Sequence, residues 1–352
     1  MPRDLSKVFT NLGDETKPIR HQLLSNLSEL TEPELAQFQA AWAGFSPARR
    51  LELLQALVDL AEERIEYHFN PIFAWTMTDA DPHIRVLAIE GLWEETGAHF
   101  IARFQHLLIY DEDVDVRAAA AMALGRFIYQ SEVNEIPGLR VDSAVEALWD
   151  VYHDPREHVH VRRRALEGIA ASSHPGVQRV IENAHYDEDL FMRSSALYAM
   201  GRTADMRWIP YLLSELKSEA PELRMEAARA LGVLEATAAV DPMIKMLDDE
   251  MDSEVRFAIL EALGEIGGEK AKQALQLTID SDNEAEAEIA ELAMEQLYAG
   301  VNNLSELIDE VLGVKPDEDT AEEETLGVWD DFYEDPLNAE IRRLIDGGDD
   351  HY

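Results

Sequence analysis

The stretch that decides the fold runs from Asp113 to Gly125 and reads DVDVRAAAAMALG. Its arginine, Arg117, stands seven residues before Leu124, and this arginine–apolar spacing occurs six times along the chain. The six arginines are Arg85, Arg117, Arg162, Arg193, Arg224 and Arg256, separated by 32, 45, 31, 31 and 32 residues. A fixed period of roughly 20 to 50 residues indicates stacked supersecondary units, none of which buries its apolar face alone.

Each unit is predicted to be a pair of antiparallel helices. Apolar residues recur at positions i, i+3, i+4 and i+7, as in the segment from Val255 to Ala262, which is helix spacing. A shorter apolar segment precedes each such helix, for example Trp208 to Leu216. Glycine follows the last apolar residue in four units, where we expect a helix end that needs positive φ. These glycines are Gly125, Gly201, Gly232 and Gly264.

The chain is expected to have three parts. Residues 1–69 form an N-terminal helical cap, residues 70–300 form the repeats, and residues 301–352 form an acidic, largely disordered tail. A seventh, degenerate unit has Ala290 in place of the arginine, as a terminal repeat would. The long interval of 45 residues contains an insertion near 130–142, interpreted either as a recognition loop or as a tolerated surface loop.

Composition limits the function classes. The formal net charge is −41, from 71 acidic and 30 basic residues, so the chain repels nucleic acid and anionic membranes. The acidity either keeps the protein apart from its own copies or attracts a basic client. Cysteine is absent, which excludes disulfides and thiolate chemistry. No apolar run approaches the length of a membrane span, and no signal peptide is recognisable, so we expect a cytoplasmic protein.

The repeat resembles HEAT repeats, and among them the short repeats named after phycobilisome lyases. The resemblance rests on the pattern apolar-Arg-x-x-Ala, the following Leu-Gly and the period near 31 residues. It implies a right-handed, all-α solenoid of about six to seven two-helix units. It also implies that the arginine joins neighbouring units together with an aspartate in the preceding turn. Asp81, Asp113 and Asp252 stand four residues before their arginines, whereas Arg162 has His158 at that offset and Arg224 has Ala220.

Three activities of similar folds can be compared with the residues present. HEAT-like di-iron hydroxylases carry His-Glu dipeptides, and none of the 11 histidines here precedes a glutamate. HEAT-fold DNA glycosylases need a basic groove, which the charge opposes. A bilin lyase-type factor would hold tetrapyrrole propionates with arginines and stack on aromatics. Its candidate residues are Arg162, Arg163, Arg164, Arg202, Tyr198 and Trp208.

Two further groups of residues attract interest. The histidines of the segment from His153 to His160 lie in and after a turn, so we interpret them as bonding to the backbone rather than to a metal. Trp329, Phe332 and Tyr333 are aromatic residues in the acidic tail, where they form either a linear motif for a partner or a contact with the chain's own repeats.

The hypothesis that follows is a non-catalytic adaptor or assembly scaffold. It holds another protein on its concave face, without a metal or a cofactor, and the bilin lyase-type factor is the alternative. Partner-binding candidates are Arg163, Arg164, Arg202, Tyr198, Trp208, Trp329, Phe332 and Tyr333, together with Glu226 on an inner helix. The six ladder arginines are assigned a structural role.

Overall fold

The computed structural model describes residues 3–133, 135, 136 and 138–312, and for residues 299–312 it describes only the backbone. All regular structure in these residues is helical. The chain divides into two compact units, residues 1–178 and 179–352. The predicted all-α solenoid of two-helix repeats is confirmed, and each unit is described by itself.

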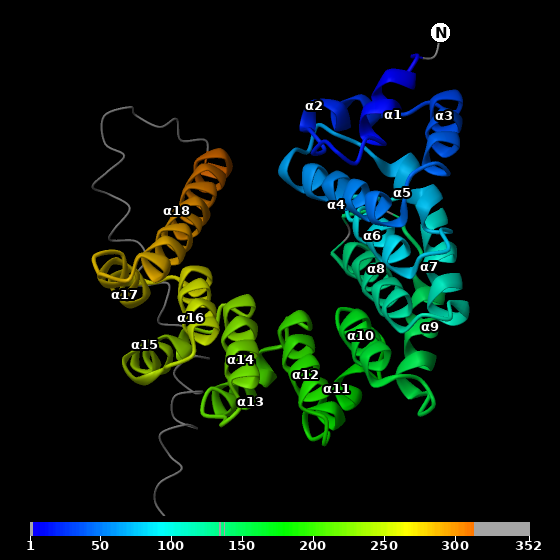
Figure 1. Cartoon of the computed structure of the whole chain (residues 1–352). Helices are drawn as coiled ribbons and strands as arrows, with labels where there is room; N and C mark the ends of the chain where they lie inside the picture. The colour runs from blue at the N-terminus through cyan, green and yellow to red at the C-terminus, as the bar shows by residue number, and fades with distance from the viewer. Residues whose placement is uncertain (1–2, 134, 137, 313–352) are drawn as a thin grey trace, which may run out of the picture. The chain divides into compact units, whose positions relative to one another are not determined.

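The first unit contains two rows of helices (Figure 1). In the inner row α4, α6, α8 and α10 contact one another in sequence order, and in the outer row α5, α7 and α9 pack against the inner helices. The helices are α1 (Ser6–Leu12), α2 (His21–Leu24), α3 (Glu32–Trp42), α4 (Pro47–Glu63), α5 (Asn70–Thr76), α6 (Pro82–Glu90), α7 (His99–Tyr110), α8 (Val114–Glu132), α9 (Asp142–His153) and α10 (Val159–Ile169). A short 3-10 helix, η1, spans Ser25–Leu27.

Two of the helices that precede the repeats, α3 and α4, begin at capping residues. Thr31 and Glu34 form a capping box at the start of α3, and Ser46 accepts a hydrogen bond from the Arg49 N–H at the start of α4. Phe38 and Trp42 of α3 are buried and pack against each other, with ring centroids 5.4 Å apart. These helices therefore contribute their own aromatic core at the N-terminal end of the first unit.

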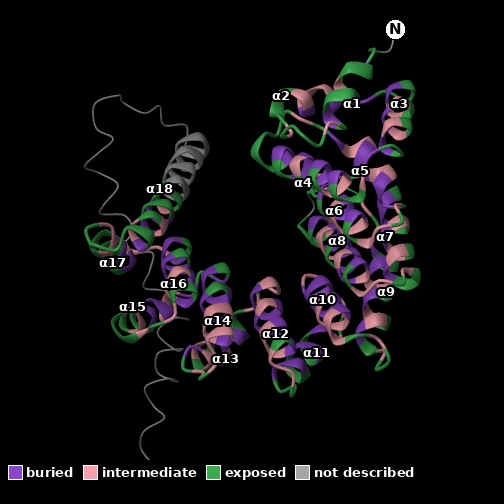
Figure 2. Cartoon of the chain, viewed as in Figure 1, coloured by how far each residue is buried: buried purple, intermediate pink, exposed green. Residues whose placement is uncertain are grey.

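The second unit repeats the arrangement. Its inner row consists of α12, α14, α16 and α18, and α13, α15 and α17 pack against the inner row. The bounds are α12 (Leu190–Arg202), α13 (Ile209–Glu215), α14 (Pro221–Val233), α15 (Val240–Asp249), α16 (Ser253–Ile266), α17 (Glu269–Ile279) and α18 (Glu284–Leu312), with the 3-10 helices η2 (Met206–Trp208) and η3 (Thr237–Ala239). Helix α11 (Val177–His185) crosses the boundary between the units. In α14, α15 and α16 buried residues lie on one side of the helix and more exposed ones on another (Figure 2).

The repeat glycines do not end helices, which corrects the sequence-based expectation. Gly125, Gly201, Gly232 and Gly264 all lie inside helices, and positive φ occurs at other glycines, Gly138, Gly267 and Gly268. Close packing explains them better. A Cβ on Gly125 would lie 2.5 Å from the Cα of Gly168, and one on Gly201 would lie 3.1 Å from the Cα of Ala230. Neighbouring inner helices therefore touch through their backbones at these positions.

The long repeat interval is partly helical. Helix α8 has 19 residues, whereas α12 and α14 have 13 each, and the chain then connects to α9 through residues 133–141. The Ser131 hydroxyl donates to the Leu139 carbonyl, and the Glu132 carboxylate accepts from the Ser173 N–H, so both ends of the connection are tied to the unit. Its role in recognition stays a prediction. The predicted boundaries near residues 69 and 300 likewise remain a proposal.

None of the helices in the described ranges is long and apolar enough to span a membrane.

Candidate functional site

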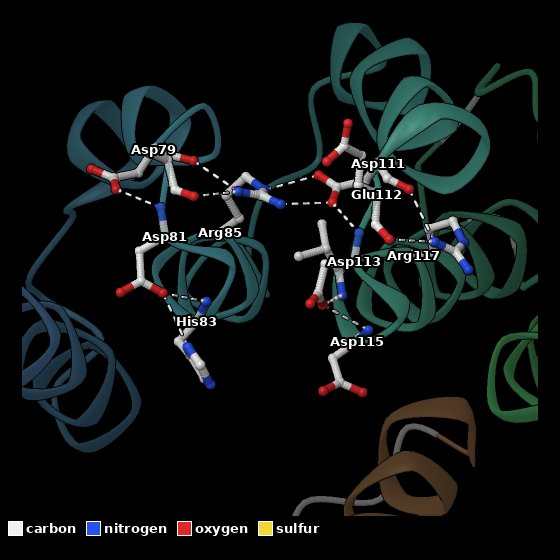
Figure 3. Close-up of polar contacts among 11 residues, drawn as sticks. Asp79, Asp81, His83, Arg85, Asp111, Glu112, Asp113, Asp115 and Arg117 are labelled. Atoms are coloured by element: carbon white, nitrogen blue, oxygen red, sulfur yellow. Dashed lines mark hydrogen bonds and ion pairs between the residues drawn. The ribbon is translucent and has the colours of Figure 1, made fainter. Parts of the chain in front are cut away.

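Four ladder arginines share one hydrogen-bond pattern. The Nη1 group of Arg85 donates to the carbonyls of Asp79 and Ala80 in its own unit, and Nε and Nη2 hold both oxygens of Asp111 at 2.8 and 2.7 Å (Figure 3). Arg117 repeats the pattern with Glu157 at 2.9 and 2.8 Å. Arg224 pairs with Glu250 and Arg256 with Glu286 in the same two-pronged manner. Such planar pairs are strong and geometrically selective.

The acid in each pair belongs to the next two-helix repeat, and it is not the aspartate that the sequence suggested as the partner. Asp81, Asp113 and Asp252 cap the N-termini of α6, α8 and α16, where they accept from backbone N–H groups. The carboxylates that hold the arginines stand elsewhere. Asp111 and Glu250 lie two residues before the capping aspartate of the following helix, and they also accept from its N–H. Each of these arginines thus joins the start of its own repeat's inner helix to a carboxylate before or at the start of the next repeat's inner helix.

Two ladder arginines depart from this pattern. Arg193 reaches Glu215 at 3.4 Å, a longer single contact. Arg162 donates from Nε to the Tyr152 carbonyl, and its guanidinium lies over the Tyr152 ring, 5.8 Å from the centroid. The pairing is therefore most regular in the first two and the last two of the six repeats that carry a ladder arginine.

The ladder groups are mostly covered. The side chains of Arg85 and Asp111 are 14% and 7% exposed, and those of Arg224 and Glu250 are 18% and 7% exposed. The hydrogen bonds from Arg224 lower the pKa of the Glu250 carboxyl below its ordinary value. In the pair of Arg117 with Glu157, the hydrogen bond to Glu157 raises the pKa of the Arg117 guanidinium. These charged groups are used in holding the repeats together.

A groove lies on the helices of the first unit, and we call it the first groove. It has a volume of about 980 Å³ and crosses α4, α6, α8 and α10. Its floor is apolar, formed by Leu51, Val86, Leu87, Ile89, Trp93, Ala118, Ala119, Met122 and Ala123. Trp93 is 42% exposed and Met122 is 40% exposed. Large apolar side chains left in water inside a groove mark an interaction site more specifically than scattered ones do.

The first groove is lined by ionisable residues of both signs. Glu52 and Glu90 lie at the end formed by α4 and α6, whereas His160 and Arg164 lie on α10. Loss of water contact raises the pKa of the Glu90 carboxyl, and the charge of Glu62 raises it further. At the other end, burial lowers the pKa of His160, and the charges of Arg163 and Arg164 add to the effect. The charges around the groove are largely compensated, because Arg49 lies 2.7 Å from Glu52 and Arg164 lies 2.6 Å from Glu167. Asp115, which also lines the groove, lies 3.8 Å from His160.

Arg126, at the edge of the first groove, is engaged in structure. Its Nη1 group donates to the Leu92 carbonyl and its Nη2 group to the Glu95 carbonyl, just beyond the end of α6. Its guanidinium also lies 5.2 Å from the centroid of the Phe127 ring. Burial lowers the pKa of Arg126 to about 10. The residue thus fastens α8 to the end of α6.

A smaller groove of about 230 Å³, the second groove, lies on α12, α14 and α16 of the second unit. Tyr198, Arg202 and Glu226, all proposed from the sequence as partner contacts, are among its lining residues. Glu261 and Glu265 line it as well, and partial burial raises the pKa of the Glu265 carboxyl, followed by the charges of Glu261 and Glu235.

The remaining predicted contact residues fall in several places. Arg164 lies in the first groove and holds Glu167 at 2.6 Å, and Arg163 donates to the His160 ring at 3.3 Å. Trp208 is only 3% exposed, so its proposed use as a surface platform for a pigment is wrong. It packs edge-on against Tyr211 in the core between helices. Trp329, Phe332 and Tyr333 lie outside the described residues.

The turn histidines contact backbone and neighbouring rings. His158 caps α10 by accepting from the His160 N–H, and the His153 ring meets the Trp149 carbonyl at 2.8 Å. Across the described ranges, no three or more His, Cys, Asp or Glu residues are grouped so that they could hold a metal ion. The described residues therefore do not fit the di-iron site of the HEAT-like hydroxylases.

Sequence reasoning missed the first groove, although a signal was present. In both grooves the lining residues recur at fixed offsets from the ladder arginine. Leu87 and Glu226 follow theirs by two residues, and Met122 and Tyr198 follow theirs by five. An exposed apolar residue at these offsets, such as Met122, distinguishes the first groove from an ordinary solvated face.

Comparisons with known proteins agree with this architecture. A family model described as HEAT repeats matches residues 209–295. The bovine deoxyhypusine hydroxylase is 29% identical over 155 residues, which cover 41% of this chain and 50% of that protein. A HEAT repeat-containing taxis protein of Halobacterium salinarum is 31% identical over 150 residues, 37% of this chain and 36% of that protein.

The chain thus matches half or less of the length of these curated relatives. Among solved structures, the complex of CpcE and CpcF of phycocyanin lyase from Nostoc gives a TM-score of 0.46 at 18% identity, covering 68% of this chain and 94% of that one. The repeat period, the arginine ladder and the match to the family model agree that the chain contains HEAT repeats, which the model matches over residues 209–295.

Proposed function

We propose that this protein is a non-catalytic adaptor or assembly scaffold that holds another protein on the inner-helix face of its repeats. The observation that carries the proposal is the first groove, with its apolar floor and the exposed Trp93 and Met122. A groove of about 980 Å³ reaches the upper end of small-ligand pockets, and it is open along four helices, which suits a polypeptide.

The charge of the chain favours a basic partner. A net charge of −41 raises the association rate of a cationic protein and excludes polyanions. Four ladder arginines take no part, because their guanidinium groups are already held by carboxylates and carbonyls; these are Arg85, Arg117, Arg224 and Arg256. Binding energy on this face would come mainly from the apolar floor, since exposed charge pairs contribute little affinity.

Site-specific photo-crosslinking in the source organism tests the proposal. A photoreactive amino acid replaces Met122 in the first groove, and a matched control replaces Tyr110, which is 69% exposed on α7 in the other row. The same pair is repeated in a chain that lacks residues 315–352. We expect a discrete protein adduct from position 122 that is absent from position 110 and weakens in the Trp93→Ala background.

Two results would contradict the scaffold function. One is equal labelling at both positions. The other is the absence of any adduct at position 122 at low salt, with a chain whose helicity is normal by circular dichroism. Loss of the adduct only when residues 315–352 are removed would show that the tail, and not the first groove, recruits the partner, and would refute the site.

A further inference from the structure

The inner helices of the second unit present a different surface from the first groove. In the first unit, residues two positions before and five positions after the ladder arginine line the groove, as His83 and Met122 do. In the second unit α14, α16 and α18 contact one another in sequence order, and Ala290 occupies the ladder position of α18. The same two positions of α16 and α18 are all exposed glutamates, namely Glu254, Glu261, Glu288 and Glu295.

Most of these carboxylates have no cation beside them. Among the residues whose side chains the structure describes, Glu254, Glu288 and Glu295 form no ion pair. Glu261 lies 3.9 Å from Arg229, and the two side chains are 49% and 44% exposed. Such a distant, solvated pair compensates little charge. The negative charge of this surface is therefore available to a partner.

Glu265 adds a carboxylate where two inner helices meet. It lines the second groove, and a Cβ built on Gly232 would lie 2.2 Å from its Oε2 atom, so its side chain reaches from α16 to α14. Partial burial raises the pKa of the Glu265 carboxyl, and the charges of Glu261 and Glu235 raise it further. A cation of a partner placed beside Glu265 would offset this repulsion.

Apolar side chains share the register of the glutamates. Val233, which lines the second groove, is 51% exposed, and Leu292, two residues after the ladder position of α18, is 57% exposed. Glutamates alone would keep this surface soluble, whereas large apolar side chains between them offer area that a partner can bury. We call the combined surface the acidic face; it consists of Val233, Glu254, Glu261, Glu265, Glu288, Leu292 and Glu295.

We propose that the acidic face docks a lysine- or arginine-rich segment of the partner that carries apolar residues between its cations. The inference goes beyond the first groove, because it assigns a second surface, in the second unit, and the charge of the segment bound there. Charge complementarity commits the occupant, since carboxylates without partners attract cations and repel phosphate and anionic lipid. Val233 and Leu292 supply the apolar contact.

Two synthetic peptides test the inference on the full-length protein. Both carry leucines at the same positions, and the remaining positions are lysine in one peptide and glutamine in the other. Binding is followed by fluorescence anisotropy in about 0.1 M KCl, where attraction between distant charges is largely screened. We expect the lysine peptide to bind at least about tenfold more tightly than the glutamine peptide.

Two sets of substitutions separate the acidic face from the general charge of the chain. The first set removes three carboxylates of the face and should weaken the lysine peptide about tenfold. The matched set removes three exposed carboxylates from the outer helices α15 and α17, and it should weaken the peptide by no more than about twofold. The sets are Glu254→Gln, Glu288→Gln and Glu295→Gln, and Asp248→Asn, Asp249→Asn and Glu269→Gln. Both leave the chain with the same net charge.

The apolar contribution has a matched pair of its own. Leu292→Ser should weaken the lysine peptide about threefold, whereas Leu277→Ser, at a residue 73% exposed on the outer helix α17, should not change its affinity. A photoreactive amino acid at position 292 should capture the partner in the source organism, and one at position 277 should not. Because both leucines are exposed, neither substitution removes a core side chain.

Several results would overturn the inference. Equal weakening by the two sets would show that the peptide responds only to the overall charge of the chain, and equal affinity of the two peptides would show that cations are not recognised. Displacement of the lysine peptide by MgCl2 at matched ionic strength would assign the face to divalent cations instead.

The outcomes also distinguish this inference from the proposed function. If neither peptide binds while position 122 still captures a partner, the inference about the acidic face is wrong and the first groove stands. If the lysine peptide binds as expected while position 122 captures nothing, the first groove fails as the site and the acidic face stands. If neither experiment gives a signal, both proposals fail.

Discussion

The arginine ladder should contribute measurably to stability, and Arg224 is the best place to test it. Its guanidinium makes two hydrogen bonds to Glu250, at 2.7 and 2.8 Å, and two to the Ser218 and Glu219 carbonyls, at 3.0 and 3.1 Å. Removing one partner of a well-buried ion pair costs about 3–5 kcal/mol. Because Arg224 is 18% exposed, water replaces part of the loss, and we expect about 2–4 kcal/mol for Arg224→Ala.

The pair itself is isolated by a double-mutant cycle with Glu250→Gln. A charge-assisted, two-pronged contact predicts a coupling energy of about 1.5–3 kcal/mol, and Arg224→Lys should lose about half of the effect because it keeps the charge but not the planar fork. The measurement is urea unfolding followed by circular dichroism. The cycle matters because it cancels changes in packing that each substitution causes alone.

The matched control is Arg229→Ala on the same helix. Arg229 is 44% exposed and lies 3.9 Å from Glu261, so its loss should change stability by no more than about 0.5 kcal/mol. Equal effects at Arg224 and Arg229, or a coupling energy indistinguishable from zero, would refute the view that the ladder joins the units by ion pairing.

Three other predictions concern pH, salt and packing. Burial raises the pKa of Glu265 above its ordinary value of 4.5, so protonation of its carboxyl adds stability as pH falls towards 4.5, whereas the hydrogen bonds from Arg224 lower the pKa of Glu250, whose contribution is lost below 4.5. Melting temperature at low salt should therefore rise as pH approaches 4.5 from above and decline below it, and a monotonic fall from pH 7 would contradict this. Melting temperature should also rise between about 0.1 and 1 M KCl, because the Debye length shortens from about 10 to 3 Å and screens the −41 charge, and a decrease would show that the ladder outweighs self-repulsion. Gly125→Ala should destabilise the protein by about 1–3 kcal/mol in urea unfolding, since its Cβ would meet the Gly168 backbone, whereas Gly44→Ala, 3.4 Å from the Ala41 carbonyl, should be nearly neutral; similar effects would disprove the backbone contact.

The repeat architecture was predictable because the spacing of the ladder arginines and the helical spacing of the apolar residues can both be read directly from the sequence. Helix spacing around Arg224 and Arg256 places the apolar residues on the buried side, and Thr31 and Ser46 mark helix starts through hydrogen bonds of their own. The glycines were misinterpreted because glycine at a helix end and glycine at a helix contact look alike in one sequence. Only the neighbouring helix, with Gly168 facing Gly125, distinguishes the two.

The sequence could not identify which residues pair between neighbouring repeats. Asp113 stands at the offset expected of a ladder acid, yet it caps α8, and the acid that holds Arg85 is Asp111. The two aspartates are two residues apart and chemically identical, so only the path of the chain decides which one faces the arginine. Trp208 shows the same limitation, because its burial depends on how its helix packs.

The ladder also explains where recognition can occur on this fold. Because the arginines hold their inner helices in a fixed orientation towards the next repeat, residues two or five positions later recur in the lining of both grooves. In the first unit these positions include Leu87 and Met122, which give an apolar floor, whereas in the second they include Glu226 and Glu261. A regular ladder therefore allows the exposed positions to vary without loss of register, and the apolar residues at these positions in the first unit are what distinguish the first groove from the second.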